Sequence, residues 1–277
     1  MTATTAATPE TRTRGPRGHY GLTNVARMEW IKLRSLRSTR WGLAILAAST
    51  IGFAILVLSI VSGHWVHMSA ADKASFDPTN QGFTGLIIGQ LVIAVLGVLT
   101  ITSEFSSGLV RATFAAVPRR PLVLAAKVVV FGGAALIAGE VLTFIAFFAG
   151  EAVLHGGVPH VTLATPGVLR AVMMAGAYVC LCGLFGLGLG AIIRHSAGAI
   201  AAVIGVIFAI PFLLLPLPDS VRNDIAKFLP EQIAASSITA VVPEAHNLSP
   251  WAGLGMLCLY AAILLGAGAI LLAKRDA

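Results

Sequence analysis

The sequence predicts an all-α integral membrane protein with six transmembrane helices. Only 11% of its 277 residues are charged and 57% are hydrophobic, whereas soluble domains carry about 25% charged residues. The apolar residues also gather in runs of about 20, the length of an α-helix that crosses the hydrocarbon core of a bilayer. Six such runs are present: Trp41–Ser62, Gly82–Ile101, Leu122–Gly150, Leu169–Ile193, Gly198–Leu217 and Trp251–Ala273.

Two segments precede the first run. Residues 1–21 are rich in threonine, alanine and arginine, and we expect a disordered cytoplasmic tail here, ahead of a transmembrane domain at 22–277. Residues 22–40, LTNVARMEWIKLRSLRSTR, combine apolar and cationic residues and predict an amphipathic helix at the membrane interface. The alternative is a plain positively charged stop before the first span. The candidate interfacial residues are Trp30, Lys32, Arg34, Arg37, Arg40 and Trp41.

Residues 102–127 form the longest polar and cationic interruption between two apolar runs. Glu104 and Arg111 lie seven residues apart, about two helical turns, which places them on one side of a continuous helix. Pro118 disfavours helix in the residue before it. We therefore expect a short amphipathic helix in this segment, then a break and the start of a membrane helix, held at a water interface. Such a shape can pass force from a soluble partner to the membrane helices.

The distribution of basic residues predicts the orientation. The chain has 19 Lys and Arg residues. Eight precede the first run, four lie in the loop 102–127, and Arg194, Lys274 and Arg275 follow even-numbered runs, so fifteen of the nineteen share one side. The positive-inside rule then predicts that both termini and this loop are cytoplasmic. The same rule accounts for the net charge of +7. Binding of nucleic acid is not predicted, because the sequence has no aromatic-rich basic domain to stack bases.

A further apolar segment, Phe228–Val242, lies between the fifth and sixth runs. It is too short to span a bilayer. We expect it to form a re-entrant or interfacial helix on the external side, before the sixth span.

Glu140 is an ionisable residue well inside the third run. Such a residue at membrane depth is a functional hypothesis by default. Contact with a substrate, a proton relay and a hydrogen bond between two helices are the alternatives. The sequence offers no obvious cationic partner at this depth, which favours a packing role.

Several sites of known chemistry are missing from the sequence. There is no GxxxxGK[ST] sequence, so the chain is not expected to hydrolyse ATP by a P-loop. His64 and His67 resemble a metal-binding pair only weakly, and no metal is expected.

Cys180 and Cys182 lie inside an apolar run and are expected to be small packing residues. Gly186 and Gly190 form a small-xxx-small pattern that predicts close helix packing.

Three segments resemble one family. They are EWIKLRSLRSTRWGL before the first run, TSEFSSGLVRATFAAVPRRPLVLAAK between the second and third, and LPEQIAASSITAVVPEAHNLSPWAGL before the sixth. With them, the chain resembles the ABC-2 type permease subunits of actinobacterial ABC transporters over nearly all of residues 22–275. The most specific piece is the central loop, with Glu104, Gly108, Arg111, Pro118, Arg120 and Lys127 in the family's order.

The resemblance implies a six-helix half-transporter of the bacterial plasma membrane. Two such subunits, identical or homologous, pair and recruit two separate ATPase chains, which bind the ATP and Mg²⁺; no cofactor is implied for this chain. The N-terminal helix corresponds to the connecting helix, and Glu104–Val117 to the coupling helix that docks on the ATPase. The implied coupling residues are Glu104, Gly108, Arg111, Phe114, Pro118 and Arg120.

The resemblance favours export over import and does not choose a substrate. Two other classes of function stay open. One is a stand-alone membrane protein, such as an ion-coupled carrier that uses Glu140 or an intramembrane enzyme. The other is an accessory or immunity-type membrane protein without transport activity.

Overall fold

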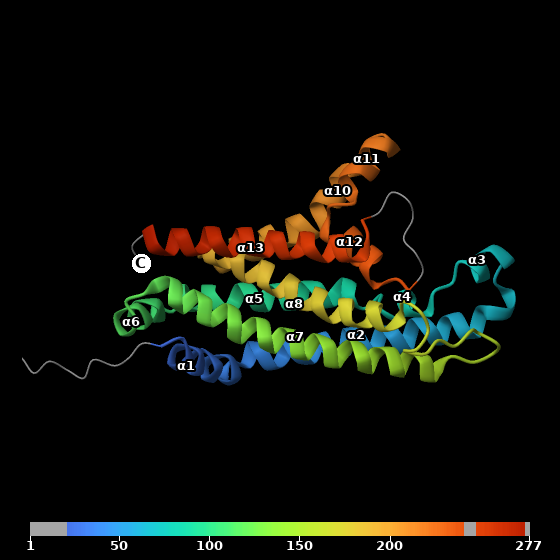
Figure 1. Ribbon diagram of the computed structural model, residues 1–277, viewed down its shortest axis with the longest axis horizontal. Coiled ribbons are helices and arrows are strands. Elements are labelled where there is room, and N and C mark those ends of the chain that lie inside the picture. Colours follow the sequence, from blue (N-terminus) through green and yellow to red (C-terminus); the bar gives the residue numbers. More distant parts are fainter. Residues whose placement is uncertain (1–20, 241–247, 275–277) are drawn as a thin grey trace, which may run out of the picture.

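The computed structural model describes residues 21–240 and 248–274, and within them the chain is helical with no β-strand (Figure 1). Six helical segments are long and apolar enough to cross a membrane. This finding confirms the predicted all-α class and the six spans, and it makes the chain a multi-pass membrane protein. The segments are Arg37–His67, Leu86–Ser106, Arg120–Val153, Val168–Ile193, Ser196–Leu214 and Pro250–Lys274.

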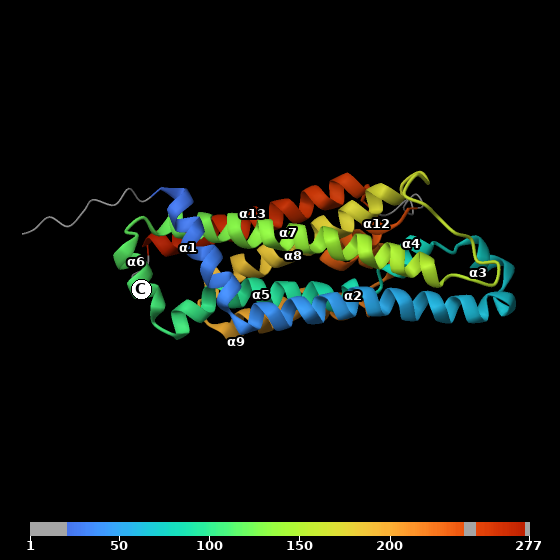
Figure 2. The same ribbon diagram turned by 90° about the horizontal axis from the view of Figure 1, so that it is seen from below.

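The spans are built from the helices α2 (Arg37–His64), α5 (Leu86–Ser106), α7 (Arg120–Val153), α8 (Val168–Ile193), α9 (Ser196–Ile204), α10 (Ile210–Leu214) and α13 (Pro250–Lys274). The shorter helices are α1 (Leu22–Ser35), α3 (Ala70–Ala74), α4 (Pro78–Gly82), α6 (Leu109–Ala116), α11 (Asp219–Ala226) and α12 (Pro230–Ile238). A 3₁₀ turn, Trp65–His67, ends the first span. Helices α1 and α6 lie at one end of the bundle, the α6 end, and α3 lies at the other, the α3 end (Figures 1 and 2).

Helix α8 lies at the centre of the bundle and packs against α5, α7 and α13. Its glycines permit this close approach. A Cβ atom added at Gly186 would lie 2.0 Å from the carbonyl oxygen of Ala94 on α5, and one at Gly176 would lie 2.8 Å from the backbone of Glu140 on α7. The small-residue pattern is therefore a packing surface, as predicted. Gly190 likewise faces α5, close to Ile101 and Val98.

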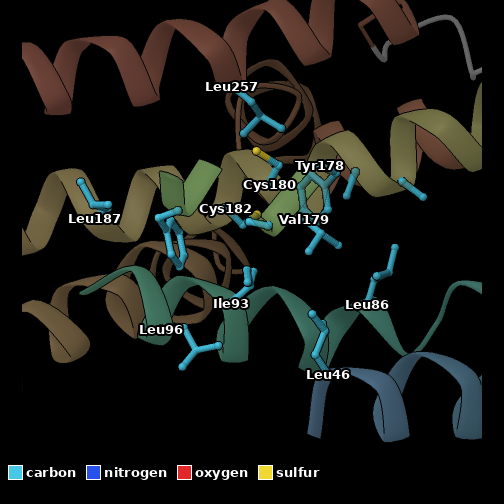
Figure 3. Close-up of a cluster of buried hydrophobic side chains, with 14 of the residues drawn as sticks. Leu46, Leu86, Ile93, Leu96, Tyr178, Val179, Cys180, Cys182, Leu187 and Leu257 are labelled. Carbon is cyan, nitrogen blue, oxygen red and sulfur yellow. The ribbon is translucent and has the colours of Figure 1, made fainter. Parts of the chain in front are cut away.

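The main apolar core fills the space between α2, α5, α7, α8 and α13, and Figure 3 shows part of it. Ile93 of α5 and Leu187 of α8 are both buried there. Cys180 and Cys182 are buried in the same core, in agreement with their predicted packing role. The hydroxyl group of Tyr178 donates a hydrogen bond to Gln90 Oε1 on α5, so the buried phenol has a partner, as buried hydroxyls normally do.

The predicted N-terminal helix is shorter than expected. Helix α1 ends at Ser35 because Leu36 is extended, with ψ of 128°. The last residues of the predicted segment 22–40 therefore start α2, which includes Arg37, Arg40 and Trp41. Helix α1 lies across the bundle and not along it (Figure 2). The predicted interfacial helix thus consists of two helices joined by a bend.

The fifth span is irregular in its middle. Between α9 and α10 the backbone forms a π-helical stretch over Gly205–Ala209. Pro211 follows two residues later, and proline cannot donate the hydrogen bond of a regular helix, so the turn before it widens. Beyond this point α10 and α11 lean away from the other helices (Figure 1).

The α3 end is held by Asp77, which caps α4. Its Oδ1 atom accepts a hydrogen bond from the backbone N–H of Thr79 at 2.9 Å. Its Oδ2 atom accepts from the Thr239 hydroxyl group at 2.9 Å and from the N–H of Ala240 at 2.8 Å. Asp77 is buried, and it joins α4 to the residues that follow α12.

The predicted external segment Phe228–Val242 contains a nine-residue helix, α12, which packs against α13 and α8. The last two residues of the predicted segment, 241 and 242, lie outside the described part of the chain. The same is true of residues 1–20 of the predicted tail. The helix itself is confirmed, whereas its re-entrant position stays a prediction.

Candidate functional site

Four charged side chains from three helices meet at the α6 end. Lys127 of α7 places its Nζ atom 2.6 Å from Glu29 Oε2 of α1 and 2.5 Å from Glu104 Oε1 of α5. Lys32 of α1 lies 3.1 Å from Glu29 Oε1 and 3.0 Å from Glu104 Oε1. We call Glu29, Lys32, Glu104 and Lys127 the ion cluster.

Three of the four residues of the ion cluster are buried although they are charged, and Lys32 is half-buried. Glu29 and Lys127 are each 3% exposed and Glu104 is 7% exposed. Glu29 is buried because Val25, Glu29 and Leu33 recur every fourth residue and form the buried face of α1. Removing such charges from water is costly unless each is paired. The two carboxylates and two ammonium groups balance, so the cluster carries no net formal charge.

Polar groups complete the cluster and connect it to α6. Lys127 also donates to the carbonyl oxygen of Thr100 at 3.3 Å, and Lys32 donates to the Thr113 hydroxyl group of α6 at 3.3 Å. Burial opposes the charge on Lys32, but the two carboxylates and their hydrogen bonds outweigh it and raise the pKa of Lys32 above its ordinary value. Lys32 therefore stays charged at physiological pH. The cluster borders a cavity of about 320 Å³ between α1, α5 and α7.

Helix α6 projects beyond the ends of α5 and α7 (Figures 1 and 2). The chain leaves α5 at Gly108, whose φ of 72° lies in the left-handed region that glycine adopts without strain. Val110 and Thr113 are buried beneath α6, and the outer face presents Leu109, Arg111 and Ala112 to solvent. The helix is thus anchored by one face and free on the other.

The prediction that Glu104 and Arg111 share one side of a helix is wrong. Glu104 belongs to the last turns of α5 and is buried in the ion cluster, whereas Arg111 is exposed on α6. The left-handed residue Gly108 interrupts the helix between them and changes its direction. Glu104 is therefore not available for docking a partner.

The other predicted coupling residues lie around α6. Phe114 is half-buried, and the guanidinium carbon of Arg120 lies 5.4 Å from the centre of its ring. Arg120 also donates to the carbonyl oxygen of Leu272 at 3.3 Å, which connects the start of α7 to the end of α13. Pro118 is exposed in the link between α6 and α7.

The predicted interfacial residues divide between the cluster and the surface. Lys32 belongs to the ion cluster. Trp30 and Arg34 are exposed on α1, and Arg37, Arg40 and Trp41 are exposed at the start of α2. Tryptophan and arginine at such positions are typical of a helix end at a membrane interface.

Glu140 lies apart from this site. It is half-buried on α7 beside Gly176 of α8, and no ion pair or hydrogen bond of its carboxylate is found within residues 21–240 and 248–274. No group of three His, Cys, Asp or Glu residues in the described chain forms a potential metal site. The role of Glu140 in transport or packing stays a hypothesis.

Glu29, Thr113 and Lys127 were not among the predicted site residues. A signal for the carboxylates was present: Glu29 is the single acidic residue of 22–40, and Glu104 is the single one of 102–127. Two lone carboxylates in cationic segments indicate local pairing. The helices that would bring them together were not evident from spacing alone.

Comparisons with protein-family models and with curated proteins found no match. The geometry of the α6 end therefore carries the functional argument.

Proposed function

We propose that this chain is the permease subunit of an ATP-driven transporter of the ABC-2 type, which forms the translocation path and receives force from separate ATPase subunits. The observation that supports this proposal most is the arrangement of α6. It is a two-turn helix outside the bundle, with one exposed face and with its buried face tied to the ion cluster.

The contacts describe how a force on α6 would reach the membrane helices. Thr113 of α6 bonds to Lys32 of α1, and Lys32 pairs with Glu104 of α5. Glu104 pairs in turn with Lys127 of α7. Because Glu104 and Lys127 are buried, separating their charges is costly. A displacement of α6 therefore moves α1 and the ends of the second and third spans together.

The remaining parts of the proposal follow the predicted orientation. The α6 end faces the cytoplasm of a bacterium, so that a soluble ATPase reaches the outer face of α6. Two permease subunits pair in the plasma membrane, and the ATPases supply the ATP and Mg²⁺. The direction of transport is export.

The test changes only the exposed face of α6. Arg111→Glu reverses a charge and Ala112→Trp adds bulk, and neither side chain is part of the ion cluster. If α6 docks on an ATPase, the double variant should still insert and purify but should lose at least about tenfold in the ATPase recovered with it, because a buried interfacial charge and its packing are both disturbed. The measurement is ATPase recovered per permease after mild solubilisation of membranes from the native host, with the ATPase recognised by its P-loop peptide.

The matched control is Ala70→Trp with Lys73→Glu on α3, at the opposite end of the bundle (Figure 1). It makes the same change of alanine to tryptophan and also replaces a cationic side chain with glutamate. This control variant should leave the recovery of ATPase unchanged. If no P-loop protein accompanies the unmodified chain, the proposal fails and a stand-alone carrier or an accessory protein becomes the better account. Equal loss in both variants would show a general effect on the membrane domain.

A further inference from the structure

A second hollow lies beside the ion cluster, and none of the four cluster residues lines it. It is a groove of about 490 Å³ between the end of α1, the start of α2, and the facing sides of α5 and α7. Its size falls within the range of roughly 300–1,000 Å³ typical of ligand pockets. Leu33 and Phe131 separate it from the cavity that borders the cluster, because both residues line the two hollows.

The groove has an apolar floor and a cationic rim. The floor consists of Ile93 and Leu96 of α5 together with Phe131, Ala134 and Ala135 of α7. The rim contains Trp30 and the exposed arginines Arg34 and Arg40. None of the residues lining the groove is acidic, and neither arginine forms an ion pair within the described part of the chain.

The position of the groove in the bundle indicates the kind of ligand that occupies it. It lies where the surface helix α1 turns into the first span, so one side is polar and the other continues along apolar helices. Trp41, one residue beyond Arg40, is 72% exposed, as an aromatic side chain at the level of lipid headgroups is. A soluble anion would satisfy the rim and leave the apolar floor uncovered.

We infer that this groove binds an anionic phospholipid, with the headgroup phosphate between Arg34 and Arg40 and one acyl chain along the floor. Arginine suits this role because its planar guanidinium group forms paired hydrogen bonds with phosphate oxygens. Basic pockets between membrane helices at the interface are a known setting for anionic headgroups. The bound lipid holds the bend between α1 and α2 against α5 and α7. This inference does not depend on the proposed transport function.

The test compares lipids retained by the whole chain. The protein is reconstituted into nanodiscs of phosphatidylglycerol and phosphatidylcholine, then transferred to mild detergent and weighed by native mass spectrometry. The unmodified chain should retain phosphatidylglycerol in preference to phosphatidylcholine. The variant Arg34→Gln with Arg40→Gln should weaken that retention by roughly 25-fold, as expected for two interfacial charges. The control Arg27→Gln with Arg119→Gln removes two exposed arginines that do not line the groove, and it should retain the lipid.

Two further arms separate the groove from a charged surface. Ala134→Phe fills the floor and leaves both arginines in place, and it should also lose the lipid. Inorganic phosphate should not raise the melting temperature of the protein, whereas phosphatidylglycerol should. The inference is overturned if the Arg34 and Arg40 variant keeps its lipid, if the control loses as much, if Ala134→Phe retains it fully, or if phosphate alone stabilises as well as the phospholipid.

Discussion

Replacing Lys127 with alanine should lower the melting temperature of the detergent-solubilised protein by roughly 10 °C, the largest effect expected for a single charged residue of this chain. Lys127 is buried and pairs with both Glu29 and Glu104. Without it, two buried carboxylates share the single ammonium group of Lys32. Removal of one partner from a buried ion pair typically costs about 3–5 kcal/mol, because it leaves a charge uncompensated.

The control for this prediction is Lys274→Ala, which removes an exposed lysine at the end of α13 and should change the melting temperature by little. A second arm adds Glu29→Gln to Lys127→Ala. The double variant restores the balance of charge in the cluster, so it should be more stable than the sum of the two single changes predicts. Equal melting temperatures for Lys127→Ala and Lys274→Ala would contradict a stabilising role for the ion cluster.

Replacing Gly186 with leucine should separate α8 from α5 and greatly reduce the folded yield. A Cβ atom at this position meets the backbone of Ala94 and not a movable side chain. Overpacking in a well-packed core typically costs about 1–3 kcal/mol, and a clash with backbone lies at or above the upper limit. We expect the fraction of monodisperse protein in size-exclusion chromatography to fall several-fold, with a lower melting temperature for what remains.

Gly133→Leu is the matched control, because a Cβ atom added at Gly133 of α7 meets no atom within 4 Å. This variant should match the unmodified chain in yield. Equal yields for the Gly186 and Gly133 variants would contradict the assignment of α8 as the closely packed centre of the bundle.

The six spans were predictable from sequence because each is a long apolar run, and hydrocarbon thickness sets its length. The helix boundaries were less predictable. Leu36 is an ordinary residue in an amphipathic pattern, yet it is extended and divides α1 from α2. The bend is fixed by tertiary contacts: α1 packs against α7 across the end of the bundle, and Lys32 of α1 pairs with Glu104 of α5.

The candidate site was predicted in part. The segment 102–127 was correctly expected to contain a short amphipathic helix. The seven-residue spacing of Glu104 and Arg111 was misleading because it assumes one continuous helix, and Gly108 interrupts that helix in the left-handed conformation. Apart from the local pair Glu29–Lys32, the ion pairs of the cluster join residues 23 to 98 positions apart in the chain. Such distant pairs depend on tertiary packing that spacing does not reveal.

We propose that the outer face of α6 docks on an ATPase, and the rest of the proposed function depends on this contact. The most direct test places a photoreactive benzoyl-phenylalanine at Ala112 on α6 and, in a matched variant, at Ala70 on α3, both of which are exposed. After irradiation of native-host membranes, the Ala112 variant should cross-link to a protein whose peptides contain a P-loop, and the Ala70 variant should not. The claim is contradicted if Ala112 yields no cross-link to a P-loop protein while the chain remains folded, or if Ala70 yields the same product.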